Sequence, residues 1–114
     1  MKNNTKLIGD AGEDLACEYL QKNSYKIVAR NYRTRFGEID IIAKDSLCLV
    51  FVEVKMKSSA RFGFPYEMVT PKKIEKIKRT AESYIADNCY KGEWRIDVVS
   101  IFGENIEHFK NITA

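Results

Sequence analysis

LCLVFVEVKM, residues 47–56, is the most apolar segment of the chain, and the sheet is expected to form around it. Its β-branched and aromatic residues predict a buried strand. Glu53 and Lys55 interrupt the apolar run two residues apart, which places both side chains on one face of the strand. A buried strand that carries a carboxylate and an ammonium group on the same face requires an explanation.

The neighbouring segments predict the rest of a sheet. EIDIIAK (38–44) predicts a second strand, and a turn at Asp45-Ser46 joins it to 47–56, so the two strands are expected to be antiparallel neighbours. Three further strands are expected at 25–33, on an edge of the sheet, at 94–102, and as a short strand within 105–112.

Two helices are expected beside these strands. One spans residues 10–22, with Asp10 as a cap at its start. Its apolar face comprises Leu15, Ala16, Tyr19 and Leu20. The other helix begins with Thr70 as N-cap and Pro71 in the first helical position.

The order of these elements predicts the fold class. Three consecutive strands on short turns predict an antiparallel meander, and a strand that follows a helix predicts a parallel crossover. The 114 residues fit one compact domain, and 45% of them are hydrophobic, which suffices for one core. Residues 1–114 are therefore expected to form a single mixed α/β domain whose sheet is flanked by helices.

Composition limits the function classes. No apolar run approaches the roughly 18 residues of a membrane span, and the N-terminal segment lacks the apolar region of a signal peptide, so a cytoplasmic protein without a membrane partner is expected. Cys17, Cys48 and Cys89 have no CxxC spacing, which argues against a disulfide framework and a zinc site. His108 is the only histidine and is expected to be structural or on the surface.

Acidic residues gather where the two central strands meet. Asp40 shares a strand face with Glu38, and the turn at 45–46 brings Asp40 beside Glu53. Adjacent carboxylates raise each other's pKa unless a cation lies between them, and such oxygen ligands suit Mg²⁺ or Mn²⁺. With Lys55 beside them, the pattern fits metal-assisted hydrolysis of a phosphodiester.

Simpler interpretations of these charges remain open. Glu53 and Lys55 also fit a half-buried ion pair or the solvated face of a sheet. Glu13, in the first predicted helix, also fits an acid that favours the helix dipole. Arg95 and Asp97 share a strand face and are expected to pair.

The ordered set of Asp40 and Glu53-Val54-Lys55 resembles the PD-(D/E)xK nuclease signature, with Ile39 in place of the proline of its first motif. Over nearly the whole chain, the sequence resembles the YraN-like family of small uncharacterised bacterial proteins. The matching segments are GDAGEDLACEYL (9–20), NYRTRFGEIDIIAKD (31–45), LVFVEVKMKSS (49–59), FGFPYEMVTPKK (62–73) and RIDVVSI (95–101). Lys57 stands where the family usually has arginine.

This resemblance implies a restriction-endonuclease-like core, similar to that of archaeal Holliday-junction resolvases. It implies that Asp40, Glu53 and the Val54 carbonyl are ligands of Mg²⁺ or Mn²⁺, that Lys55 is the catalytic lysine, and that Glu13 is an additional helix acid. A resolvase-like function also implies a homodimer.

Basic and aromatic residues surround the expected site. The candidate contacts to nucleic-acid phosphates are Arg30, Arg33, Arg35, Lys57, Arg61 and Lys73. Solubility explains the same charges equally well. Phe62, Phe64 and Tyr66, in the irregular segment 57–69, either stack on exposed bases or pack that segment onto the core.

The resulting hypothesis is a metal-dependent nuclease that hydrolyses DNA, in particular branched or structured DNA. Two alternatives remain: a nucleic-acid-binding module with the same fold but little or no turnover, and a protein-interaction adaptor. Metal affinity separates the nuclease from the adaptor, and so does salt-dependent binding to DNA.

Overall fold

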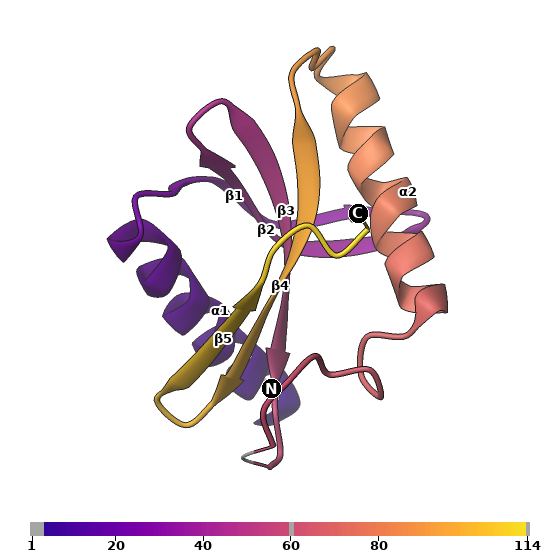
Figure 1. Ribbon diagram of the computed structural model, residues 1–114. Coiled ribbons are helices and arrows are strands. Elements are labelled where there is room, and N and C mark those ends of the chain that lie inside the picture. Colours follow the sequence, from indigo (N-terminus) through magenta and orange to yellow (C-terminus); the bar gives the residue numbers. More distant parts are fainter. Residues whose placement is uncertain (1–3, 60, 114) are drawn as a thin grey trace.

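The computed structural model describes residues 4–59 and 61–113, with no side-chain description for 4–10, and it contains one five-stranded sheet between two helices (Figure 1). The elements are α1 (Asn4–Lys22), β1 (Lys26–Thr34), β2 (Gly37–Asp45), β3 (Cys48–Met56), α2 (Pro71–Asp87), β4 (Trp94–Phe102) and β5 (Asn105–Phe109). Every predicted element is present, with ends that differ by a few residues.

The strands lie in chain order across the sheet, β1-β2-β3-β4-β5. Three of the four neighbouring pairs are antiparallel, and β3 and β4 are parallel because α2 connects them. The predicted meander and parallel crossover are thus confirmed. β1 lies on an edge, as predicted, and β3 occupies the centre, which accounts for its apolar sequence.

The two helices cover opposite faces of the sheet (Figure 1). On the α1 face, Ala16 and Leu20 pack with Val50 and Val52 of β3. On the α2 face, Ile77 and Ala81 pack with Leu49 and Phe51 of β3 and Ile96 of β4. Alternation along β3 therefore decides which helix each side chain meets, and it continues to Glu53 and Lys55 on the α2 side.

The start of α2 is as predicted: Thr70 adopts an extended conformation, and its hydroxyl accepts a hydrogen bond from the Lys73 amide at 3.3 Å. The start of α1 is not. This helix already begins at Asn4, so Asp10 lies inside it and does not cap it. Aspartate is favoured at helix N-caps, which suggested this start, but a helix also tolerates aspartate in its interior at a modest cost.

The predicted apolar face of α1 was also partly wrong. Ala16 and Leu20 are fully buried, whereas Leu15 is 40% exposed and Cys17 takes its place in the core. A free cysteine behaves as a small apolar residue, so this exchange rotates the buried face slightly around the helix.

The first residues of β2 are not paired with β3. The ladder between these two strands starts at the pair Ile41–Val52, and the part of β2 before Ile41 pairs with β1 alone. In Figure 1 the β1–β2 hairpin passes behind α2, while the end of β3 runs to the bottom of the view. The divergence leaves room at the end of β3 between the two helices.

Candidate functional site

A pocket of about 250 Å³ lies at the divergence of β2 and β3. We call it the acidic pocket; its lining includes Glu13 from α1, Glu38 and Asp40 from β2, and Glu53, Val54 and Lys55 from β3. All five residues predicted for catalysis or metal binding thus meet in one place. Segments distant in the sequence contribute to it because the central hairpin opens at this end.

Asp40 is held by the main chain of the neighbouring strand. Its Oδ2 accepts a hydrogen bond of 2.8 Å from the Val54 amide. Burial raises the pKa of Asp40 to about 8, and the neighbouring Glu53 carboxylate adds to the shift, against the opposing effects of the Val54 N–H and Lys55. Asp40 therefore holds a proton near neutral pH, beside Glu53.

Lysines lie on the α2 side of this acid pair. Lys55 Nζ is 3.5 Å from Glu53 Oε2, and both side chains are largely buried. Lys73, in the first turn of α2, has a lowered pKa, mainly because the positive charge of Lys55 is close, with burial as the second cause. The predicted phosphate contact Lys73 thus lies beside the acidic pocket.

Glu13 approaches from the opposite helix and is only 8% exposed. Burial raises its pKa, as does the nearby Asp40, while hydrogen bonds to Arg30 and Asn31 lower it. Beside Glu13, α1 approaches the end of β3 closely at Gly12, where an added Cβ would lie 2.6 Å from the Met56 sulfur and would displace that side chain.

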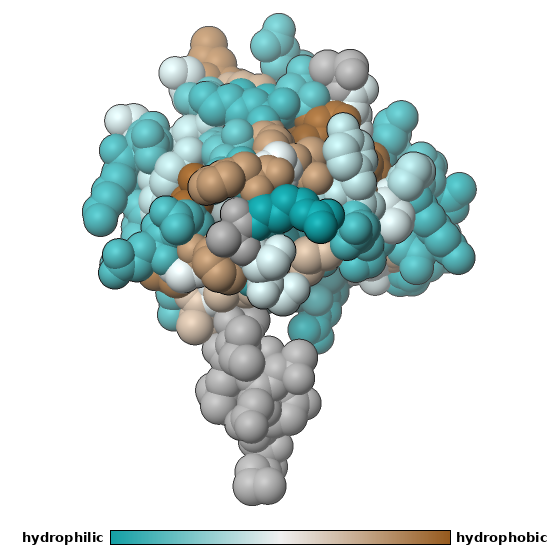
Figure 2. Space-filling view, turned by 60° about the horizontal axis from the view of Figure 1, so that its bottom comes forward, coloured by the Kyte–Doolittle hydropathy of each residue, from teal (hydrophilic) through white to brown (hydrophobic). Residues whose placement is uncertain are grey.

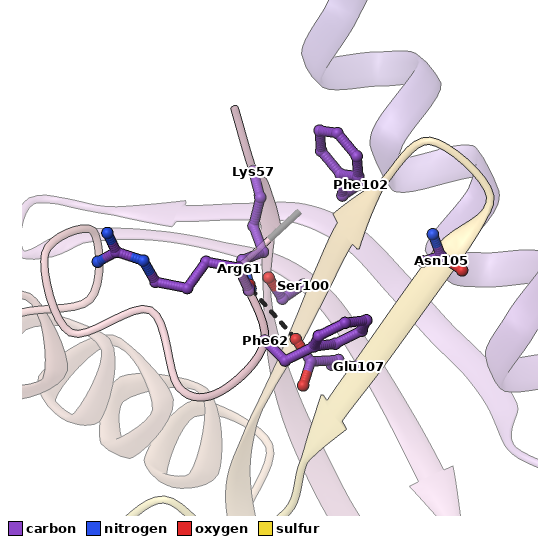
Figure 3. A pocket seen from close by; sticks show the side chains of 7 residues that line it. All are labelled: Lys57, Arg61, Phe62, Ser100, Phe102, Asn105 and Glu107. Carbon is purple, nitrogen blue, oxygen red and sulfur yellow. Dashed lines mark hydrogen bonds and ion pairs between the residues drawn. The ribbon is translucent and has the colours of Figure 1, made fainter. Parts of the chain in front are cut away.

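The other predicted cations have partners of their own. Arg30 contacts Asp14 at 2.8 Å and Glu13 at 3.5 Å. Arg33 lies 3.4 Å from Glu38, which places it at the rim of the acidic pocket. Arg35, in the β1–β2 turn, lies over the ring of Phe36. The remaining two, Lys57 and Arg61, line a separate pocket beyond the end of β3 (Figure 3).

Two residues of this site were not among the predicted site residues. Glu38 lines the acidic pocket; the sequence had indicated that it shares a strand face with Asp40, but no role was assigned to it. Asn31 has a left-handed backbone, with φ of 56°, in the middle of β1. This conformation turns Arg30 toward α1 and Tyr32 toward Tyr84 of α2, and only asparagine's mild tolerance of positive φ hinted at it.

The donor set fits a hard divalent cation. In residues 4–59 and 61–113, no three side chains of His, Cys, Asp or Glu are grouped to hold a metal ion. Mg²⁺, however, typically takes one or two carboxylates and completes its shell with water. Asp40, which holds a proton near neutral pH, offers the place of that proton to a cation, and Glu53 lines the same pocket, so both residues fit the ion that the motif implies.

A second buried cluster is structural. Asp97 is fully buried and accepts hydrogen bonds from Arg95 Nε at 3.0 Å and from the Asn111 amide at 2.9 Å. Its other oxygen lies 2.7 Å from His108 Nε2, and His108 Nδ1 contacts the Tyr19 hydroxyl. This confirms the predicted Arg95–Asp97 pair and the structural role of His108, which ties β5 to β4 and α1.

Fold and site together define a small mixed α/β protein with a pocket of acids and lysines where two central strands diverge. Residues 12–101 match the sequence model of the Uncharacterised protein family UPF0102, and the chain belongs to this family. Membership confirms the YraN-like resemblance that the motifs indicated. In the part of the chain that the structure describes, no helix is long and apolar enough to cross a membrane.

Curated relatives are similar over almost their full lengths. The UPF0102 protein of Persephonella marina is 48% identical over 104 residues, which cover 90% of each chain. That of Cytophaga hutchinsonii is 46% identical over 106 residues, 92% of this chain and 94% of the relative. That of Thermotoga petrophila is 46% identical over 100 residues, 88% of this chain and 91% of the relative. Their shared name describes no activity.

Proposed function

We propose that the protein is a metal-dependent nuclease that hydrolyses phosphodiester bonds of DNA. The observation that carries this proposal is the convergence of Asp40, Glu53 and Lys55 in one pocket, with the pKa of Asp40 raised to about 8. A carboxylate pair of this kind destabilises the folded protein when both acids ionise, so an ion pair without further purpose is a poor explanation for it.

Asp40, Glu53 and the Val54 carbonyl would hold Mg²⁺ or Mn²⁺. When bound, the ion supplies positive charge at the phosphate and lowers the pKa of a coordinated water. Lys55, kept in place by Glu53, is positioned to orient the attacking water and to stabilise negative charge on the phosphate. Lys73 adds a second ammonium group on the same side and suits a contact to a neighbouring phosphate.

Glu13 has a different role from the other acids. Its raised pKa and its place on α1, opposite Lys55 and Lys73, suit a group that gives a proton to a leaving oxygen. Arg30 holds Glu13 from the solvent side, so we assign Arg30 to positioning this acid in addition to any contact with DNA.

A nucleic-acid-binding module with little turnover is the second candidate. The raised pKa of Asp40 favours it, because a protonated acid does not repel a polyanion. The two candidates differ in whether substrate is cut when the metal is present.

The test is single-turnover cleavage of labelled linear duplex, flapped duplex and four-way DNA with Mg²⁺ or Mn²⁺. Glu53→Gln and Lys55→Met are each expected to slow cutting by about 100-fold or more. Glu93→Gln and Lys91→Met remove the same charges from exposed positions in the α2–β4 connection and are expected to leave the rate unchanged. Cutting that is equal in wild type and Glu53→Gln would refute the nuclease, and binding without cutting would favour the module.

A further inference from the structure

The segment that joins β3 to α2 has both of its ends at the acidic pocket. It leaves β3 at Met56, directly after Lys55, and enters α2 at Pro71, two residues before Lys73. Lys55 and Lys73 are close enough for their charges to interact. The part of this segment that comprises residues 61–69, which we call the aromatic loop, is thus attached on both sides to elements that reach the acidic pocket.

Inward contacts hold the aromatic loop on the sheet. The Gly63 amide donates to Glu107 of β5 at 3.1 Å, and Lys57 Nζ contacts the same carboxylate at 3.1 Å and also donates to the Arg61 carbonyl. Figure 3 shows Lys57 and Glu107 linked in this way. Lys57 is thus engaged in fixing the loop, which leaves it poorly placed for its predicted phosphate contact.

Apolar contacts complete the attachment. The Phe64 ring packs edge-on against Phe109 of β5, with centroids 5.3 Å apart, and Val69 is 1% exposed. Main-chain hydrogen bonds from Met68 and Val69 to the Pro65 carbonyl form a tight turn. The aromatic loop consequently presents its remaining side chains from a fixed backbone.

Two of those side chains are large aromatic rings that face solvent. Phe62 is 76% exposed and Tyr66 is 77% exposed, while Phe64 between them is packed inward. Figure 2, which brings the bottom of Figure 1 forward, shows apolar surface on this face interleaved with hydrophilic side chains. Two exposed rings on one loop offer apolar faces on which a planar group can stack.

Cations lie beside both rings. The Arg61 guanidinium, on an 80% exposed side chain, extends away from the pocket that Phe62 lines (Figure 3). Lys110 and Tyr66 line the same apolar groove of about 440 Å³, beside Pro71 at the start of α2. Glu67, 3.7 Å from Arg61, is a solvent-exposed partner that a phosphate can replace.

We propose that Phe62 and Tyr66 stack on unpaired bases of DNA next to the bond that is cut, so that the substrate is DNA with unpaired nucleotides, such as a flap, a gap or a single strand. The part of this inference that concerns cutting rests on the proposed function. Bases inside a duplex are already stacked on one another, whereas unpaired bases offer a free face to aromatic side chains. The cations beside the rings then contact the phosphates of the same strand.

The proposed substrate class is narrower than branched DNA in general. A fully paired four-way junction leaves the two rings without a partner, whereas a flapped duplex satisfies them. An apolar protein segment would fit the groove at Tyr66, but it would not use Arg61 and Lys110 or the position of the loop between Lys55 and Lys73.

Binding without divalent metal tests the proposal. Fluorescence anisotropy in EDTA compares wild type with Phe62→Ala, Tyr66→Ala and the double variant on a flapped duplex, a single strand of equal length and a blunt duplex. Each single variant is expected to lose about 5-fold or more in affinity for flapped and single-stranded DNA and nothing for blunt duplex. Phe62→Trp is expected to retain affinity and to lose fluorescence when single-stranded DNA binds.

Leu47→Ala is the matched control, because Leu47 is 90% exposed and lies in the β2–β3 turn at the other end of β3. It is expected to bind every DNA as wild type does. The salt dependence is expected to be unchanged in the ring variants, since the rings carry no charge. Melting temperatures near that of wild type verify that the variants fold.

Three outcomes would overturn the inference. The ring variants could lose affinity equally for blunt and flapped DNA, or lose affinity for no DNA. Wild type could also bind a matched RNA strand more tightly than DNA, which would make RNA the substrate. The proposed function fails separately. Selective loss of flap binding without metal-dependent cutting by wild type would refute the nuclease and support the stacking surface. If wild type cuts DNA and the ring variants bind and cut it equally well, the nuclease is supported and the stacking surface is refuted.

Discussion

The Asp40 carboxylate accepts a hydrogen bond from the Val54 amide at 2.8 Å, at the point where the β2–β3 ladder has ended. A side chain of one strand thus satisfies a main-chain donor of the next, which would otherwise lack a partner in the sheet. The same bond fixes Asp40 beside Glu53 while the two strands diverge. The hydrogen bond between Val54 and Asp40 therefore lies at the end of the ladder and holds Asp40 in the acidic pocket.

Replacing Asp40 separates its hydrogen-bonding role from its acidity. Asp40→Asn retains an acceptor for the Val54 amide, whereas Asp40→Ala leaves this donor unpaired. We expect Asp40→Ala to be less stable than Asp40→Asn by about 1–2 kcal/mol at pH 6. Urea denaturation of both variants measures the difference, and equal stability would show that the bond contributes nothing.

The raised pKa of Asp40 makes the stability of the metal-free protein depend on pH. Its ordinary pKa is 3.8 and that in the folded protein is about 8, so between these values the folded state holds a proton that the unfolded state has released. The free energy of unfolding therefore falls as pH rises, by up to about 1.4 kcal/mol per pH unit.

Urea denaturation in EDTA at pH 6, 7 and 8 measures this slope. Asp40→Asn is expected to flatten most of it, with a remainder in the same direction from the raised pKa of Glu13. A wild-type stability that increases over this range, or a slope that Asp40→Asn leaves untouched, would contradict the arrangement of the acids.

The proximity of Lys55 and Lys73 can be tested through the pKa of Lys73. Because the charge of Lys55 is the main cause of the lowered pKa of Lys73, Lys55→Met is expected to return that pKa toward its ordinary value of 10.5. NMR titration of labelled lysine side chains measures it directly. Lys78→Met, which removes an exposed lysine further along α2, serves as the control and is expected to change nothing. If Lys55→Met leaves the pKa of Lys73 unchanged, the two lysines are not close, and the start of α2 does not lie beside the acidic pocket.

The left-handed Asn31 predicts an unusual pattern of substitutions in β1. Glycine adopts positive φ without strain, so Asn31→Gly is expected to cost within about 1 kcal/mol, whereas the β-branched Asn31→Val is expected to cost about 1–2 kcal/mol. Arg33→Val, at a position of ordinary strand backbone, is the control and is expected to be tolerated. Thermal unfolding ranks the three, and a harmless Asn31→Val would refute the kink.

The sequence was most informative where local rules decide the structure. The turn at Asp45-Ser46 sets the register of the central hairpin, and Ser46 adopts the positive φ that such a turn requires. Strand alternation then brings Asp40, Glu53 and Lys55 together, as predicted. Thr70 and Pro71 fixed the start of α2 for the same reason, because a cap depends on its immediate neighbours.

Contacts between distant segments could not be predicted in this way. Lys57 directly follows β3, and no local pattern indicates its ion-pair partner, because Glu107 lies on β5. The backbone of Asn31 departs from the alternation that strand patterns assume. The exposure of Leu15 reflects how α1 is rotated over the sheet, which depends on packing against several strands at once.

Calorimetric titration of Mn²⁺ into wild type and Glu53→Gln tests most directly whether the acid pair exists to bind a cation. One site is expected in wild type, with release of a proton that makes the observed heat depend on the buffer, because the ion displaces the proton held by Asp40. No such site is expected in Glu53→Gln, and an unchanged site is expected in the control Glu93→Gln. Equal binding in wild type and Glu53→Gln, or binding to neither, would show that the acid pair does not bind a cation.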